Sequence, residues 1–267
     1  MPTVKANGIN IYYETAGEGE PLVLICGLNY SLWQWRRMIP GLADHYEVIA
    51  FDNRGSGKTD KPPGPYNVFM LAADTVGLLD ALDINRAIIV GHSMGGFVAQ
   101  QMALSHPERV SKLVLASTNF GGPHHIPITP EAMAVLADRS GDQAELQRRG
   151  AAIACAPGFA EAHPDIIEEW VAYRLTGPVL PEAYQAQMAV GLALIAEDAC
   201  FEHRLKNVKC PTVIFFGEHD RVVPPGNAAL LAAKIPHSVV HILPDAGHMF
   251  PIEAPDAAVA ALVKLLK

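Results

Sequence analysis

Short apolar runs recur along the first 120 residues, each bounded by glycine, proline or polar residues. The runs span Ile9–Glu14, Leu22–Cys26, Glu47–Phe51, Ala87–Val90 and Lys112–Ala116. Residues 22–25 and 88–90 are apolar at every position, which is typical of strands buried on both faces of a parallel sheet. We therefore predict strands at these runs, in a sheet whose two faces are both covered.

Helical patterns separate these runs. They cover Leu32–Ala43, Asn67–Leu82 and Met94–Ser105. Asn67 is a candidate N-cap, because its side-chain oxygen can accept a hydrogen bond from a free amide of the first turn. Strands that alternate with helices of this length predict βαβ units.

The middle of the chain has a different pattern. Gly121-Gly122-Pro123 interrupts the alternation, and the composition from there to residue 206 favours helices without a strand. Alternation then resumes, with strands predicted at Thr212–Gly217 and Ser238–Leu243 and helices at Pro225–Lys234 and from Asp256 onward. The simplest architecture is an α/β core domain, residues 1–120 and 207–267, whose mostly parallel central sheet has helices on both faces. Residues 121–206 are then a helical cap inserted between two strands.

Composition and charge narrow the classes of protein. The chain of 267 residues is 50% hydrophobic and 18% charged, which excludes an intrinsically disordered protein. Its formal charge of -8 makes nucleic acid and anionic membranes poor partners. No apolar run approaches the roughly 18 residues of a membrane-spanning helix, and the first residues show no signal peptide. We expect a cytoplasmic protein with no nucleic-acid or membrane partner.

The four cysteines, at positions 26, 155, 200 and 210, form no C-x-x-C pair. Neither a metal site nor a redox motif is therefore supported by their spacing. Buried thiols are the favoured interpretation, and a disulfide between Cys155 and Cys200 is the alternative.

One motif carries candidate chemistry. The strand predicted at residues 86–90 continues into Gly91-His92-Ser93-Met94-Gly95-Gly96 and then into an apolar helix, which is G-x-S-x-G in a strand–turn–helix context. Small residues two before and two after the serine let strand and helix approach closely. Such a turn lifts the Ser93 hydroxyl above the carboxyl ends of the strands. The Met94 amide, at the helix N-terminus, points to where an oxyanion would form.

A nucleophilic serine needs a base and a group that orients the base. His248 lies in the loop after the last predicted strand, and Asp220 lies just past the end of the strand at 212–217. Both positions are at the same sheet edge as Ser93, and the order Ser93, Asp220, His248 is that expected on such a sheet. Glu218 and Asp245 are alternative acids, although Asp245 is very near His248 in sequence.

These segments resemble the α/β-hydrolase fold family, in particular its serine esterase and enol-lactonase branch, over nearly the whole chain. Besides GHSMGG, residues 51–60 (FDNRGSGKTD) are similar to the family's D-x-R-G-x-G-x-S loop. Cys210–Asp220 and Asp245–His248 are similar to its acid and histidine loops, and the inserted helices to its cap. A nucleophilic Ser93 in place of Asp argues against a haloalkane dehalogenase.

The resemblance also implies a second oxyanion donor, the backbone amide of Leu28. Family members usually carry His-Gly before this position, whereas this chain has Cys26-Gly27. Because the donor is a main-chain amide, we expect the oxyanion hole to form despite this difference in sequence.

Several side chains are candidates for binding the substrate. Trp33 and the cap residues Trp170, Tyr173 and Met188 could line an acyl pocket, although for each residue alone core packing is the favoured interpretation. Arg54 and Arg174 could anchor a substrate carboxylate. For Arg54, fixing its own loop is the favoured interpretation.

Two other signals are set aside. Gly55-Ser56-Gly57-Lys58-Thr59 imitates the end of a phosphate-binding P-loop, but Asp52 stands where the signature requires its first glycine. That carboxylate would repel a nucleotide. The adjacent His124 and His125 suggest a metal, but no cysteine or carboxylate cluster is spaced to join them.

The sequence therefore predicts a serine hydrolase that cleaves a small-molecule carboxylic ester or lactone without cofactor or metal, as a monomer or homodimer. A C–C bond hydrolase of vinylogous diketones and a weakly catalytic ligand sensor are the alternatives, because each can retain the same three residues.

Overall fold

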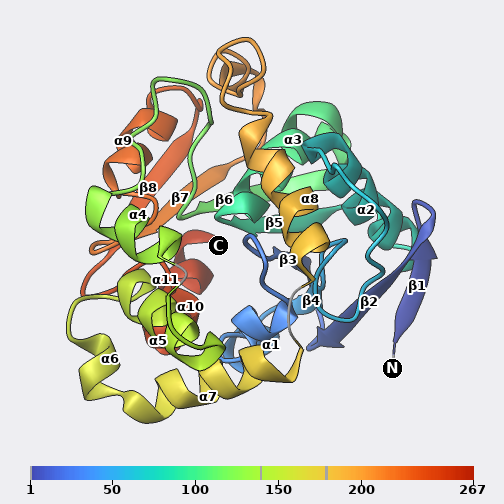
Figure 1. Ribbon diagram of the computed structural model, residues 1–267. Coiled ribbons are helices and arrows are strands. Elements are labelled where there is room, and N and C mark those ends of the chain that lie inside the picture. Colours follow the sequence, from blue (N-terminus) through green and yellow to red (C-terminus); the bar gives the residue numbers. More distant parts are fainter. Residues whose placement is uncertain (1, 139, 178–179) are drawn as a thin grey trace.

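The computed structural model of the protein describes residues 2–138, 140–177 and 180–267. Its centre is an eight-stranded sheet in the order β1-β2-β4-β3-β5-β6-β7-β8 (Figure 1). The strands are β1 (Thr3–Ala6), β2 (Ile9–Ala16), β3 (Pro21–Ile25), β4 (Glu47–Phe51), β5 (Ala87–His92), β6 (Val110–Ala116), β7 (Thr212–Gly217) and β8 (Ser238–Leu243). β1 and β2 run antiparallel to their neighbours, and the pairs from β4 to β8 are parallel. The predicted mostly parallel sheet is confirmed.

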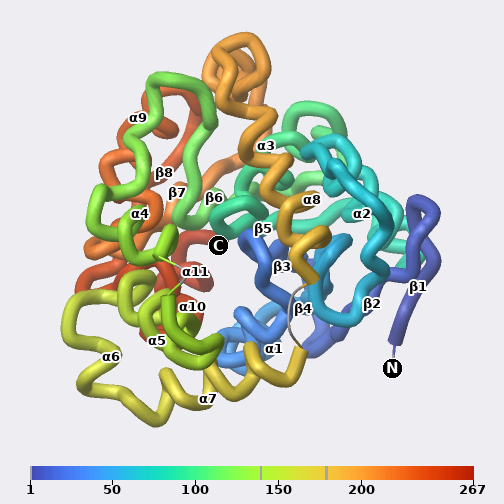
Figure 2. The backbone as a smooth tube through the Cα atoms, in the orientation of Figure 1, coloured from blue at the N-terminus to red at the C-terminus, as the bar shows by residue number. Residues whose placement is uncertain are grey.

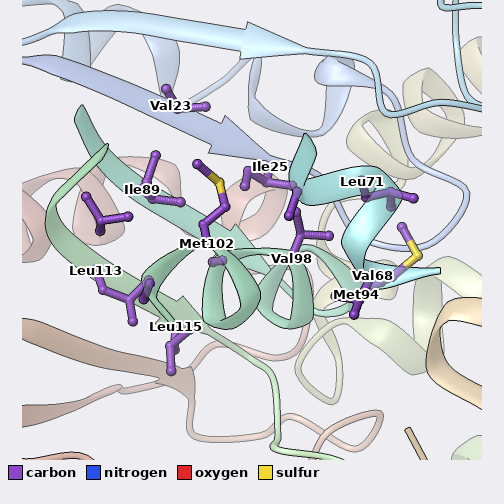
Figure 3. Packing of buried hydrophobic residues seen from close by; sticks show 14 of the residues in the cluster. Val23, Ile25, Val68, Leu71, Ile89, Met94, Val98, Met102, Leu113 and Leu115 are labelled. Carbon is purple, nitrogen blue, oxygen red and sulfur yellow. The ribbon is translucent and has the colours of Figure 1, made fainter. Parts of the chain in front are cut away.

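Helices cover both faces of this sheet. α2 (Val68–Ala81), α3 (Met94–Ser105) and α9 (Gly226–Ala232) pack on one face, while η1 (Leu32–Trp35), α1 (Ile39–Ala43) and α11 (Pro255–Leu265) pack on the other. Figure 3 shows the first face, where Ile89 of β5 lies beside Met102 of α3 and Ile25 of β3 lies beside Val98 of α3. Removing this apolar surface from water stabilises the fold by roughly 25 cal/mol per Å², and it fixes the strand ends on which the site is built.

The segment between β6 and β7 leaves the sheet and returns to it, as the green-to-orange path in Figure 2 shows. It contains α4 (Pro130–Ala137), α5 (Gln143–Ala154), α6 (Phe159–Ala162), α7 (Pro164–Thr176) and α8 (Pro181–Leu192), and no strand in its described residues. We keep the name cap for residues 121–206; residues 139, 178 and 179 of this range lie outside the described part. The cap has its own apolar cluster, in which Ile167 and Trp170 of α7 pack with Met249 and Ile252 from beyond β8.

Short elements complete the chain. They are η2 (Pro107–Arg109), η3 (Leu205–Asn207) and α10 (Phe250–Glu253). No helix in the described ranges combines the length and the apolar character needed to cross a membrane. All four cysteines are buried, with free thiols, which agrees with the favoured prediction and not with a disulfide.

Most element bounds follow the sequence prediction, with two informative differences. The helix expected over Leu32–Ala43 is two pieces, η1 and α1. Pro40 lies in the first turn of α1, where its missing amide is tolerated, whereas a continuous helix would need that amide. β1 was not predicted, since it has four residues and lies at the sheet edge with only one buried position. The Asn67 cap is confirmed, because its side chain accepts a hydrogen bond from the Met70 amide at 3.0 Å.

Candidate active site

Ser93 occupies the turn between β5 and α3 in a strained backbone conformation. Its φ is +55° and its ψ is -118°, a backbone conformation that residues other than glycine rarely adopt. Three hydrogen bonds hold the turn: the Ser93 amide donates to the Ala116 carbonyl at 2.9 Å, and the Ser93 carbonyl accepts from the Gly96 amide and from Thr118 Oγ1 at 2.9 and 2.8 Å. Strain fixed by such contacts is typical of functional turns.

The glycines of the motif are required by close backbone contacts. A Cβ on Gly91 would lie 2.3 Å from the Gly95 carbonyl oxygen, and one on Gly95 would lie 2.5 Å from the Ile25 carbonyl oxygen. Both distances are shorter than real Cβ contacts. The tight approach of strand and helix that the sequence motif predicts is therefore present.

His248 and Asp220 lie together at the carboxyl edge of the sheet. The His248 Nδ1 atom is 2.9 Å from Asp220 Oδ2. The other carboxylate oxygen, Oδ1, accepts hydrogen bonds from the Val222 and Val223 amides at 2.9 and 2.8 Å. Both side chains are buried, with 7% and 0% of their surfaces exposed. Two backbone donors and the imidazole thus fix the carboxylate behind the ring.

The backbone of His248 is held by the residue before the serine. The ring of His92 donates from Nε2 to the His248 carbonyl at 2.8 Å, and the two rings lie 4.7 Å apart. Burial, and then the neighbouring His248, lower the pKa of His92 well below its usual value, so it stays a neutral donor. His92 thereby links the serine turn to the histidine loop.

Glu253 also supports the histidine loop. Its two carboxyl oxygens accept hydrogen bonds from the Gly247 amide at 2.6 Å and from the Ala156 amide of the cap at 2.8 Å. Burial raises the pKa of Glu253 to about 7. This carboxyl joins the histidine loop to the cap.

The loop after β3 runs beside Ser93. A Cβ on Gly27 would lie 3.2 Å from the Ser93 Cβ, so only glycine leaves the present spacing undisturbed. The Leu28 and Met94 amides donate no hydrogen bond within the described residues. These two main-chain N–H groups near the serine are therefore free to donate hydrogen bonds to an oxygen.

Cys26 fills the position before Gly27 with a buried thiol. It contacts the Phe51 carbonyl at 3.8 Å, and burial raises its pKa well above the usual value. Side-chain support of the loop comes from elsewhere: the Gly27 amide donates to Gln34 Oε1 at 3.2 Å, and Asn53 donates to the Cys26 carbonyl at 3.0 Å.

Two cavities open at Ser93. The first, about 250 Å³, is lined by Ser93, Leu28 and His248 together with Trp170 and Arg174 of α7. The second, about 240 Å³, is predominantly apolar and lies under α8; Ser93, Leu28 and Met94 share its lining with Phe97 and Met188. Ser93 and His248 thus face one space, and within the described residues the Ser93 hydroxyl forms no hydrogen bond.

The predicted pocket residues divide into two groups. Trp170 lines the first cavity and Met188 the second. Trp33 and Tyr173 line neither, because their rings stack on each other with centroids 4.5 Å apart and Tyr173 hydrogen-bonds Ser31. These two residues form a seam between cap and core.

The two candidate arginines also differ. Arg54 forms a bidentate ion pair with Asp74, with both distances 2.5 Å, and only 9% of its side chain is exposed. This agrees with its fixing of its own loop. Arg174 lines the first cavity and donates to the Asn29 carbonyl.

The aspartate of the P-loop-like segment holds the backbone of two loops. Asp52 accepts hydrogen bonds from the Leu32 and Lys58 amides, both at 2.7 Å. A Cβ on Gly57 would collide with the Asp52 carboxylate at 2.0 Å. The carboxylate therefore fills the space that a phosphate would need.

The histidine pair of the cap entrance does not converge on one point. His124 contacts Glu202 at 2.8 Å, while His125 donates to the Gly122 carbonyl at 2.7 Å. Among the described residues one trio brings possible metal-ligating atoms within 4.8 Å of one another, namely Glu218, His219 and Asp245, and all three are exposed. The alternative acids of the sequence analysis, Glu218 and Asp245, thus lie outside the buried contact with His248.

Sequence reasoning missed His92, Glu253 and Gln187. His92 stood inside the serine motif, and its place next to the nucleophile was the available signal. Gln187 of α8 is buried and hydrogen-bonds the Asn29 amide and the Arg54 carbonyl. Neither it nor Glu253 gave a local signal, because these partners and the cap partner of Glu253 lie far away in the sequence.

Comparisons with known proteins agree on one family. The family model described as alpha/beta hydrolase fold matches residues 20–255. The 3-oxoadipate enol-lactonase 2 of Acinetobacter baylyi is 30% identical over 271 residues, covering 98% of this chain and 96% of that protein. Two solved structures are similar: a meta-cleavage product hydrolase from Pseudomonas fluorescens (TM-score 0.84, 26% identity, covering 100% and 97%) and an enol-lactonase from Burkholderia xenovorans (TM-score 0.83, 26% identity, covering 99% of each chain).

Proposed function

The chain belongs to the alpha/beta hydrolase fold family, and on that premise we propose that it cleaves a carboxylic ester or lactone with Ser93 as nucleophile. The observation that carries the proposal is the buried 2.9 Å contact between His248 and Asp220, in a histidine loop that faces the same cavity as the strained Ser93. Similarity to two enol-lactonases supports a lactone or ester as the substrate class.

In the proposed mechanism His248 takes the proton of the Ser93 hydroxyl while its oxygen attacks the substrate carbonyl. Asp220, already hydrogen-bonded to Nδ1, keeps the other ring nitrogen free to accept that proton and stabilises the imidazolium. The Leu28 and Met94 amides donate to the tetrahedral oxyanion; losing one such donor typically costs about 3 to 4 kcal/mol of barrier.

The intermediate then collapses, and His248 returns the proton to the leaving alkoxide. A water molecule, deprotonated by His248, attacks the Ser93 acyl ester and releases the acid. In a lactone the leaving group remains part of the acyl chain, so one product forms.

The direct test is labelling and turnover. A fluorophosphonate should modify Ser93 on the wild-type protein, as mapped by mass spectrometry, and p-nitrophenyl butyrate should be hydrolysed in steady state. Ser93→Ala should lower kcat by at least about 10⁴-fold while leaving the circular dichroism spectrum unchanged. Retained turnover in this variant would overturn the assignment, and a single slow burst without a steady rate would indicate a sensor.

A second candidate is hydrolysis of a C–C bond in a vinylogous diketone. It is favoured by the similarity to the meta-cleavage product hydrolase. The same three residues serve either reaction, so a panel of esters, lactones and diketones assayed side by side separates the two by their relative kcat/KM values.

A further inference from the structure

Asn29, in the loop after β3, has both of its backbone polar groups held by side chains of the cap. Its amide donates to Gln187 Oε1 of α8 at 2.8 Å, and its carbonyl accepts from Arg174 Nη1 of α7. The guanidinium also lies over the Tyr30 ring, 5.1 Å from its centroid. Two cap helices thus bind a single residue of the core loop.

The cap contacts hold the backbone of Asn29 in a left-handed conformation. Its φ is +65°, which asparagine adopts more readily than most residues other than glycine but which still costs free energy relative to an extended or helical backbone. Such a conformation persists where surrounding contacts over-determine it. Here the contacts that bind its amide and its carbonyl come from Gln187 and Arg174 of the cap.

Gln187 is a rigid acceptor. Only 1% of it is exposed, and its Nε2 donates to the Arg54 carbonyl and to Ser56 Oγ, both at 2.8 Å. The orientation of the amide group is determined, because the Arg54 carbonyl can only accept and the Asn29 amide can only donate. The core therefore aims Oε1 of Gln187 at the loop.

We propose that Gln187, assisted by Arg174, is a positioning residue for the oxyanion hole, so that docking of the cap and completion of the hole are one event. Leu28, whose amide is the proposed oxyanion donor, directly precedes Asn29 in the chain. A relaxation of Asn29 out of the left-handed region displaces that amide from Ser93. The inference rests on the proposed function, since the position of the Leu28 amide affects the rate only if an oxyanion forms there.

The test compares an ester with its thionoester, in which the carbonyl oxygen is replaced by sulfur. Sulfur is a weak hydrogen-bond acceptor, so the ratio of the two kcat/KM values reports how well the amides bind the developing anion. Gln187→Met keeps the side-chain length and removes all three hydrogen bonds. We expect kcat for p-nitrophenyl butyrate to fall about 10- to 100-fold, KM to change less than about threefold, and the oxygen-to-sulfur ratio to fall with kcat.

Two control variants separate positioning from general damage. Gln101→Met is the same substitution at a buried glutamine of α3 that contacts Ser105 and not the loop, so kcat and the ratio should be unchanged. Met188→Leu alters the second cavity beside Gln187, so KM and kcat are free to change while the ratio should stay constant.

Arg174→Met provides a second route, because this side chain is only half-buried and its loss is easier to tolerate than that of Gln187. The ratio should fall in the same direction, and the double variant should lose less than the product of the two single effects, since both side chains hold one residue. An unchanged ratio in a folded Gln187→Met protein overturns the proposal; if that protein does not fold, an unchanged ratio in Arg174→Met does so.

Failure of the proposed function gives a different result. In that case the wild-type protein hydrolyses neither ester and the fluorophosphonate leaves Ser93 unmodified. Wild-type turnover together with unchanged ratios in the variants leaves the hydrolase proposal standing and removes only the role of Gln187 and Arg174.

Discussion

The sheet edge and the cap contribute to the candidate site by different means. At the sheet edge, Ser93, Asp220 and His248 each follow the end of a strand, and neighbouring backbone groups fix them. Besides the apolar cluster that Ile167 and Trp170 form with residues beyond β8, single side chains join the cap to the core. Gln187 of the cap and Glu253 of the core are examples, and their partners across this interface lie far away in the sequence. The position of the three proposed reacting groups is thus a property of the fold, whereas the alignment of the loops beside them depends on contacts between cap and core.

The largest expected effect tests the sheet edge itself. Asp220→Asn keeps the shape of the side chain but loses the charge behind His248, and it favours the ring tautomer that cannot accept the Ser93 proton. We expect kcat to fall about 10⁴-fold. Steady-state hydrolysis of p-nitrophenyl butyrate measures it, with unfolding in urea as the check on structure. A loss below tenfold would mean that another acid orients the ring.

The same contrast explains what could be predicted from the sequence. The serine turn follows from glycines whose neighbours lie within a few residues, and His248 and Asp220 follow from their places after strands β8 and β7. The bounds of β4 and β7 were readable because continuous apolar runs define them. Local pattern and local sterics suffice for these features.

The remaining features depend on contacts that no local pattern contains. Gln187 meets Asn29 across 158 residues of sequence, and a buried glutamine in an apolar helix has no distinguishing signal. Trp33 and Tyr173 have the composition of pocket residues, yet they stack on each other at the seam. Which aromatic side chain faces a cavity is decided by how the cap docks, which depends on many weak contacts together.

The second prediction concerns the support beneath the sheet edge. Asp74 is 2% exposed and pairs with Arg54, whose carbonyl in turn accepts from Gln187. Asp74→Asn leaves the Arg54 charge buried without its counterion, so the free energy of unfolding should fall by about 3 kcal/mol. Urea unfolding followed by circular dichroism measures this loss. A change below 1 kcal/mol would indicate that water reaches the guanidinium.

The third prediction tests the joint between cap and histidine loop by pH. The pKa of Glu253 is raised from 4.5 to about 7, so the folded protein binds more protons than the unfolded chain between these values. Stability from this group is therefore fully present below pH 4.5 and is lost as the pH rises through 7. The difference amounts to at most about 3 kcal/mol.

Glu253→Gln removes this titration, so the variant is the reference. Between pH 5 and pH 8 the wild-type protein should lose unfolding free energy relative to Glu253→Gln, as measured by urea unfolding at both pH values. A constant difference would show that the carboxyl titrates normally and that its contacts with Gly247 and Ala156 are solvated.

The smallest effect is expected at the outer margin of the cap. Glu169 of α7 pairs with Arg36 and with Arg37, the latter at 2.8 Å, and 44% of its side chain is exposed. Water and salt screen such pairs, so Glu169→Gln should change the free energy of unfolding by less than about 1 kcal/mol. Its kcat should equal that of the wild type, because the side chains of both arginines pair with Glu169 and, within the described residues, hydrogen-bond neither loop at Ser93. Thermal unfolding and ester hydrolysis on the same preparation test both statements. A reduced kcat here would mean that the whole cap, rather than the contacts of Gln187 and Arg174 with Asn29, sets the geometry of the site.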